Sequence, residues 1–165
     1  MLTQEQARGL AQGLELERWT PAVTLDNGAS VRAKLEYDVD SRLEENGDEF
    51  GAIHWPERDS RARPAGCDGS ARKIVTRNGP VWWQPPKDVV SDVDALASLE
   101  KRVREYFHEY WTYVGVVVEV TAPACVTCGE RKRETFSLWG IESDSGAEHF
   151  AEVIADLTSE ANVTA

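Results

Sequence analysis

The stretch Ser30–Asp40, with the sequence SVRAKLEYDVD, decides the predicted fold of this 165-residue chain. Its odd positions carry apolar side chains, and its even positions from 32 onward carry charged ones. A period of two with one apolar face is typical of a half-buried strand in an antiparallel sheet. Asn27-Gly28, just before it, favours a tight turn because this pair adopts positive φ at low cost. We therefore expect Val23–Leu25 to pair with the stretch as a hairpin.

Other segments also carry strand patterns. In chain order they are Phe50–Trp55, Lys73–Thr76, Val81–Gln84, Tyr113–Val120 and Thr135–Glu142. Asn78-Gly79 lies between Lys73–Thr76 and Val81–Gln84 and predicts that these two strands form another hairpin. Pro85-Pro86 ends the second of these strands. A turn over residues 121–133 is expected to join the last two strands.

Three segments carry helical patterns. Thr3-Gln4-Glu5-Gln6 has the form of a capping box and predicts a short helix up to about Glu17. The clearest helix covers about 92–110, where apolar residues recur at spacings of three and four. A second capping box, Ser145–Glu148, predicts a final amphipathic helix that runs past Leu157.

These elements predict the α+β class, because every pair of strands can close through a short turn without a parallel crossover. We expect a single twisted antiparallel sheet of about five to seven strands. Two main helices would cover one face of it, in addition to the short N-terminal helix. The expected organisation is one domain over residues 1–160, with a frayed tail at 161–165.

The charge of the chain restricts its partners. With 29 acidic and 18 basic side chains, the net charge is −11. Such a field disfavours direct binding to nucleic acid and to anionic membranes, and it favours basic protein partners. No apolar run is long enough to span a bilayer, and the N-terminus lacks the pattern of a secretion signal, so the expected location is the cytoplasm. A homodimer is left open.

Cys125-x-x-Cys128-Gly129 lies in the predicted turn between two strands, as in a zinc knuckle. Structural zinc takes four ligands, and no second pair of this spacing exists in the chain. Cys67 with a histidine (His54, His108 or His149) is one source of the missing ligands, and a second chain sharing the ion across a two-fold axis is another. The alternative is that these are ordinary cysteines at a hairpin tip, and no cofactor is then needed.

Glu36, Asp38 and Asp40 share one face of the predicted strand, about 7 Å apart in succession. Carboxylates at this spacing can hold Mg²⁺ for phosphoryl transfer. The alternative is a solvated strand face whose charges discourage edge-to-edge pairing. The chain contains no glycine-rich phosphate loop and no nucleophile-elbow motif, so we predict no catalytic residue.

Tryptophan is unusually frequent, with six residues. Trp82 and Trp83 are adjacent on a strand and must point to opposite faces of the sheet. By the same alternation, Trp139 faces away from Phe136 and Leu138. Large aromatic side chains on an outer face indicate a partner or cover by the chain itself, for example by the loop at 56–70.

One stretch, Ser137–Asp144 with the sequence SLWGIESD, resembles a family of small actinobacteriophage and prophage proteins that has no assigned activity. The resemblance covers roughly residues 72–161, including Arg77–Pro86 and Tyr113–Val120. It implies a phage origin and the cytoplasm of the host cell. It supplies no catalytic residues, and the turn with Cys125 and Cys128 looks like an addition to the family pattern.

The leading hypothesis is therefore a small acidic phage protein that acts by non-covalent binding to a host protein, itself basic or nucleic-acid-binding. The residues expected to carry the interaction are Asp38, Asp40, Glu44, Glu45, Trp82, Trp83 and Trp139. A zinc-stabilised binding module built on Cys125 and Cys128 is the first alternative. A metal-dependent phosphoryl-transfer enzyme on the face of Glu36, Asp38 and Asp40 is the second.

Overall fold

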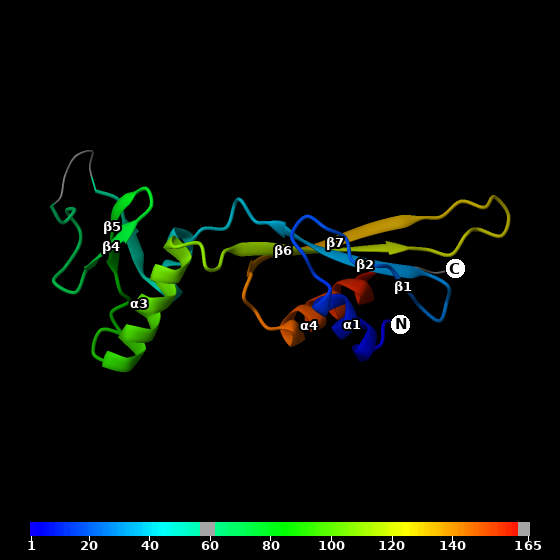
Figure 1. Cartoon of the computed structure of the whole chain (residues 1–165), viewed down its shortest axis with the longest axis horizontal. Coiled ribbons are helices and arrows are strands. Elements are labelled where there is room, and N and C mark those ends of the chain that lie inside the picture. Colours follow the sequence, from blue (N-terminus) through cyan, green and yellow to red (C-terminus); the bar gives the residue numbers. More distant parts are fainter. Residues whose placement is uncertain (57–61, 162–165) are drawn as a thin grey trace. The chain divides into compact units, whose positions relative to one another are not determined.

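A four-stranded antiparallel sheet and a three-stranded antiparallel sheet organise the chain, and a computed structural model describes residues 1–56 and 62–161 (Figure 1). The chain falls into two compact units. Unit 1 combines Met1–Val39 with Thr112–Ala165, and unit 2 is Asp40–Trp111. Each unit has its own sheet.

The sheet of unit 1 has the strand order β1-β2-β6-β7, with every neighbouring pair antiparallel. Its strands are β1 (Val23–Thr24), β2 (Ser30–Tyr37), β6 (Tyr113–Thr121) and β7 (Arg133–Glu142). The predicted turn before β2 is confirmed, because Gly28 has a φ of 79° and its N–H donates to Leu25. The alternation predicted for β2 is also confirmed, since Val31, Ala33 and Leu35 are buried.

Two helices, α1 (Gln4–Gln12) and α4 (Ala147–Glu160), lie side by side on one face of this sheet (Figure 1). Together they close an aliphatic core. Its fully buried members include Val31, Ala33, Val114, Val116, Val118 and Ile154. This core is the one that the period-two and helical patterns predict.

The ends of these helices differ in part from the prediction. The capping box of α1 is present, because Thr3 and Gln6 each donate a backbone N–H to the side chain of the other. The helix stops at Gln12 rather than near Glu17, since the following residues run along the edge of β2. There Leu35 donates its N–H to Glu15. The second predicted capping box is wrong, because α4 begins after Gly146 and no side chain caps it.

Unit 2 contains the sheet β3-β5-β4 and the helix α3. Its elements are η1 (Leu43–Glu45, a 3-10 turn), α2 (Gly47–Phe50), β3 (Ala52–His54), β4 (Arg72–Thr76), β5 (Gly79–Gln84) and α3 (Val93–Phe107). Asp92 caps α3 and accepts hydrogen bonds from the N–H groups of Asp94 and Ala95. An ion pair between Arg72 and Glu100 links β4 to α3.

The α+β class is confirmed, but the prediction of a single sheet is wrong. The alternating pattern of β2 does not continue as a strand beyond Tyr37, and two short helical turns, η1 and α2, separate it from β3. Tyr37 and Val39, expected on the apolar face, are 55% and 76% exposed. One domain over 1–160 stays a prediction, because units defined by contacts can fold together or separately. Of the predicted frayed tail, residues 162–165 lie outside the described part of the chain.

The two units are joined in a particular topological way. β2 and β6 are hydrogen-bonded neighbours, with Tyr37 opposite Val114. The N–H of Asp38 donates to the carbonyl of Tyr113 at 3.2 Å. Unit 2 is therefore an insertion in the chain between β2 and β6, which are paired strands of unit 1.

Candidate functional site

The outer face of the unit 1 sheet, opposite α1 and α4, carries a layer of aromatic and charged side chains. Trp19, from the segment along the edge of β2, contacts two cations of that strand. The guanidinium carbon of Arg32 lies 4.5 Å, and Nζ of Lys34 4.8 Å, from its ring centroid. Arg32 also forms a bidentate ion pair with Glu119, at 2.9 and 3.1 Å, and Lys34 pairs with Glu36. The charges on this face are thus neutralised within unit 1.

Trp139 lies against the backbone of β6 on this outer face. The register shifts between Val114 and Val116, so that β7 has one more residue than β6 at this point. Gly140, with a φ of 78°, has the left-handed conformation that such a bulge requires. A Cβ atom at Gly115 would overlap the ring of Trp139, so the ring packs where a side chain is missing. Trp139 remains 45% exposed.

The bulge also determines the place of Asp38. Its carboxylate accepts a hydrogen bond of 2.8 Å from the N–H of Gly140. Glu36 is held by Lys34, and Asp40 belongs to unit 2. Among the described residues, no group of three or more Asp, Glu, His or Cys side chains could hold a metal ion. Glu36, Asp38 and Asp40 therefore form no such group in the described part of the chain, and the metal-dependent enzyme stays a prediction.

An acidic segment, Leu43–Phe50, forms in unit 2 from η1 and α2. Leu43 and Phe50 are buried and anchor its two ends. Between them the four carboxylates of Glu44, Glu45, Asp48 and Glu49 are exposed or half-exposed. None of these four forms an ion pair with any described residue. The segment therefore presents a concentrated negative charge that no described residue neutralises through an ion pair.

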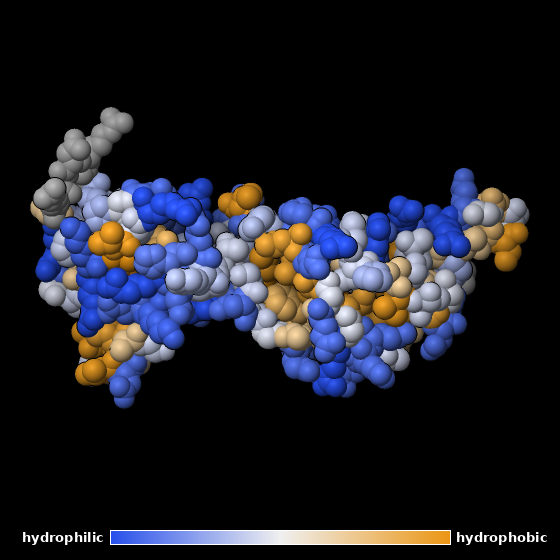
Figure 2. Space-filling model, viewed as in Figure 1, coloured by the Kyte–Doolittle hydropathy of each residue, from blue (hydrophilic) through white to orange (hydrophobic). Residues whose placement is uncertain are grey.

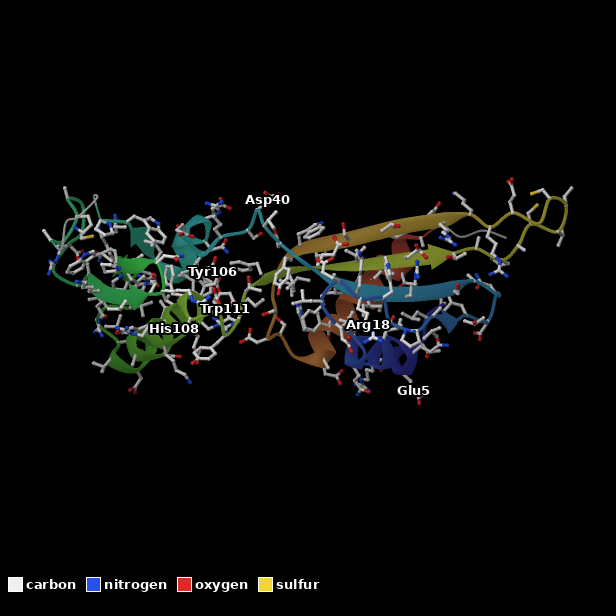
Figure 3. All side chains as sticks on the ribbon, turned by 45° about the horizontal axis from the view of Figure 1, so that its top comes forward. Glu5, Arg18, Asp40, Tyr106, His108 and Trp111 are labelled. Atoms are coloured by element: carbon white, nitrogen blue, oxygen red, sulfur yellow. The ribbon has the colours of Figure 1, made fainter. Side chains whose placement is uncertain are left out.

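The acidic segment lies against an aromatic cluster. Tyr106 and Trp111, labelled in Figure 3, have ring centroids 5.0 Å apart, and Phe50 packs on Trp111 at 5.9 Å. Burial raises the pKa of Tyr106, and the negative charges of Glu44 and Glu45 act in the same direction. The backbone of the acidic segment is thus supported by a packed aromatic layer.

The two adjacent tryptophans of β5 point to opposite faces, as predicted. Trp83 is fully buried, and its Nε1–H donates to the carbonyl of Phe50 at 2.6 Å. Trp82 is half-buried beneath the guanidinium of Arg63, 5.5 Å from its ring centroid. The loop expected at 56–70 thus contributes cover through Arg63, while residues 57–61 lie outside the described residues. Trp83 is a core residue and cannot contact a partner in this fold.

The Cys125–Cys128 turn lies at the tip of the β6–β7 hairpin. Both cysteines are exposed, with free thiols. Hydrogen bonds from the backbone N–H groups of Cys128 and Thr127, and from the Cys128 thiol, lower the pKa of Cys125 to about 7. The third cysteine, Cys67, belongs to unit 2, and burial raises the pKa of its thiol.

The sequence prediction missed Trp19, whose position beyond the first helix suggested only a helix end. The cation-rich outer face of β2 is the feature that could have indicated a covering aromatic side chain.

No protein-family model, curated protein or solved structure matches this chain. Within the described ranges, no helix combines the length and the apolar character needed to cross a bilayer.

Proposed function

We propose that this chain is a non-catalytic binding protein that recognises a basic protein partner through the acidic segment Leu43–Phe50. The observation that carries the proposal is the set of four carboxylates in two short helical turns, none of them in an ion pair with a described residue. These four carboxylates give up no ion pair with a described cation on binding. They are therefore free to form new pairs with lysine or arginine side chains.

A comparison with the outer face of unit 1 supports the choice of surface. There Arg32, Lys34, Glu36 and Glu119 satisfy each other, so a charged partner would have to break existing pairs. In the acidic segment, a charged partner would not have to break any ion pair with a described residue. The aromatic layer under it restricts its backbone before binding, which reduces the entropy lost on association.

The net charge of −11 supports the same class of partner, because it steers basic proteins toward the chain and repels nucleic acid. With the resemblance to phage proteins, the proposed partner is a basic or nucleic-acid-binding protein of the bacterial host, met in the host cytoplasm. Asp38 and Asp40 precede the acidic segment in sequence and are proposed as further acidic contacts. Trp82 and Trp139, both partly exposed, are the proposed aromatic contacts.

The test is a neutralised variant that keeps side-chain size: Glu44→Gln, Glu45→Gln, Asp48→Asn and Glu49→Gln combined. The matched control neutralises four exposed acids of unit 1 that also lack ion pairs with described residues, Glu5, Glu152, Asp156 and Glu160. Both variants change the net charge equally. The partner is first identified by co-purification from host lysate, and its Kd is then measured for the wild type and both variants.

We expect the neutralised segment to weaken binding about tenfold or more, and the control to weaken it much less. Raised salt should weaken the wild-type complex and should narrow the difference between the variants. Equal affinities for the two variants would mean that only net charge matters and would remove the acidic segment from the interface. An absence of any partner whose binding depends on salt would contradict the proposal as a whole.

A further inference from the structure

The backbone around Cys125 has the arrangement of a metal-binding knuckle. Cys125 and Cys128 lie three residues apart in one tight turn at the hairpin tip. The turn is closed on both sides, because Gly129 donates to the Cys125 carbonyl and Cys125 donates to the Glu130 carbonyl, each at 2.8 Å. Gly129 has a φ of 74°, a conformation that other residues adopt only with strain.

The turn thus holds the two cysteines three residues apart and leaves both side chains exposed. The Cys128 thiol donates a hydrogen bond to the Glu130 carboxylate at 4.0 Å. Two thiolates at one knuckle supply half of the tetrahedral set that Zn²⁺ takes in structural sites.

No group of three potential ligands forms here among the described residues. Both cysteines are exposed, and no third potential ligand joins them among the described residues. Cys67, the remaining cysteine of the chain, is half-buried, and its elevated pKa disfavours the thiolate. A second knuckle of the same kind is therefore available only on a second copy of the chain.

The hairpin tip is suited to meet its own copy. In unit 1 the β6–β7 hairpin extends beyond α1 and α4, so its tip is not covered by the helices (Figure 1). Val126, between the two cysteines, is fully exposed. Figure 2 shows hydrophobic surface at this tip with hydrophilic side chains beside it. Two tips in contact would cover this apolar surface.

Charge favours the same contact. Two chains of net charge −11 repel each other, but residues 121–133 contain one acid, Glu130, and three bases, Arg131, Lys132 and Arg133. Lys132 pairs with Glu134. A Zn²⁺ ion with four thiolates carries two negative charges, which Arg131 and Arg133 of the two chains would balance. Contact at the tips thus places the positive part of each chain at the site.

We propose that Cys125 and Cys128 form half of a tetrahedral Zn²⁺ site, which the same two cysteines of a second copy complete. Each thiol that binds releases its proton to solvent, and no oxidation or reduction takes place. Zinc thus joins two copies through their hairpin tips.

The experiment uses the full chain, purified without a tag, reduced and freed of metal with a chelator. Zn²⁺ is titrated against a chromophoric chelator, and the mass in solution is followed by sedimentation. We expect one ion bound per two chains and a change from monomer to dimer over the same range of zinc. In a parallel titration, Co²⁺ should give the intense visible bands and thiolate charge-transfer bands of a tetrahedral site with four sulfur ligands.

Cys125→Ser and Cys128→Ser should each abolish stoichiometric binding and dimerisation. Cys67→Ser is the matched control and should change neither. Circular dichroism checks that the tip variants keep the fold, which is expected because both side chains are exposed. One ion per monomer, dimerisation without zinc, or binding that survives Cys128→Ser would each overturn the proposal. The acidic segment takes no part in this site, so the test does not depend on the proposed function.

Discussion

The two units bury apolar surface with different side chains. In unit 1 the core is mainly aliphatic and comes from alternate positions of long strands and from two amphipathic helices. In unit 2 the strands are short, and much of the core is aromatic. Its buried or packed aromatic members are Phe50, Trp83, Tyr106 and Trp111.

This difference determines how the stability of each unit is distributed among its core residues. A regular aliphatic core spreads its burial over many residues, each of modest area. A tryptophan or tyrosine buries roughly 150–250 Å² alone, so a few aromatic residues can dominate a small unit. Unit 2 should therefore be more sensitive than unit 1 to the loss of one side chain.

The largest effect is expected for Trp83→Ala. This side chain is fully buried and hydrogen-bonded to Phe50, so its truncation should cost about 3–5 kcal/mol of unfolding free energy. Hydrogen exchange should show loss of protection in β4, β5 and α3, with β6 still protected. Trp82→Ala, on the other face, is the control and should cost much less. Equal loss of protection in both units would mean that they unfold as one domain. It would contradict the claim that unit 2 is more sensitive to the loss of one side chain.

Val118→Ala tests unit 1 at its centre. Val118 is fully buried on β6, and removing two methyl groups should cost about 2 kcal/mol, measured by denaturant unfolding. Protection should fall in β2 and β6 by less than Trp83→Ala lowers it in unit 2. Val75→Ala, at a position 65% exposed, provides the baseline and should be near neutral. A cost for Val118→Ala as large as that of Trp83→Ala would contradict the distributed core of unit 1.

Gly115→Ala tests whether the Trp139 ring packs on Gly115 at the outer face of the unit 1 sheet. The added methyl group would displace the Trp139 ring, and we expect a loss of about 1–2 kcal/mol together with a shift in tryptophan fluorescence. In a Trp139→Ala background the same substitution should cost clearly less, which a double-mutant cycle measures. Additive costs would show that the two residues do not interact.

The smallest effect concerns acid stability in unit 2. Burial raises the pKa of Glu100, but hydrogen bonds from Arg104 and Arg72 and their positive charges outweigh it, so the net pKa lies below its usual range. Because the folded-state pKa is lowered, this stabilisation is present above about pH 4.3 and is lost as the pH falls through the folded-state value. Glu100→Gln should therefore reduce stability at neutral pH by less than about 1 kcal/mol and make its acid dependence shallower. An unchanged pH profile would contradict the assigned role of Glu100.

Local patterns predicted the elements well but not their assembly. Three predictions that depend only on neighbours in sequence are confirmed: the alternation of Val31, Ala33 and Leu35, the turn at Gly28, and the capping box at Thr3. Which strands share a sheet depends on contacts between distant segments, and the single sheet was accordingly wrong.

For the candidate surfaces too, the sequence predicted local features but not contacts between distant segments. Alternation placed Trp82 and Trp83 on opposite faces but could not say which face is buried. The position of Trp139 follows from its packing on Gly115 of another strand, and that of Asp38 from the backbone of Gly140. The place of Cys125 and Cys128 in one hairpin turn was predictable, because Cys125, Cys128 and Gly129 lie within five consecutive residues.

The hydrogen bond between Asp38 and Tyr113 means that the chain leaves unit 1 and returns to it one strand spacing apart, about 4.8 Å. The pairing of β2 with β6 thus requires only that the two ends of the connecting segment, residues 40 and 111, lie close together. Since the entropy of loop closure grows only slowly with length, a two-residue linker or a foreign domain with adjacent termini could be grafted at this point without altering the register.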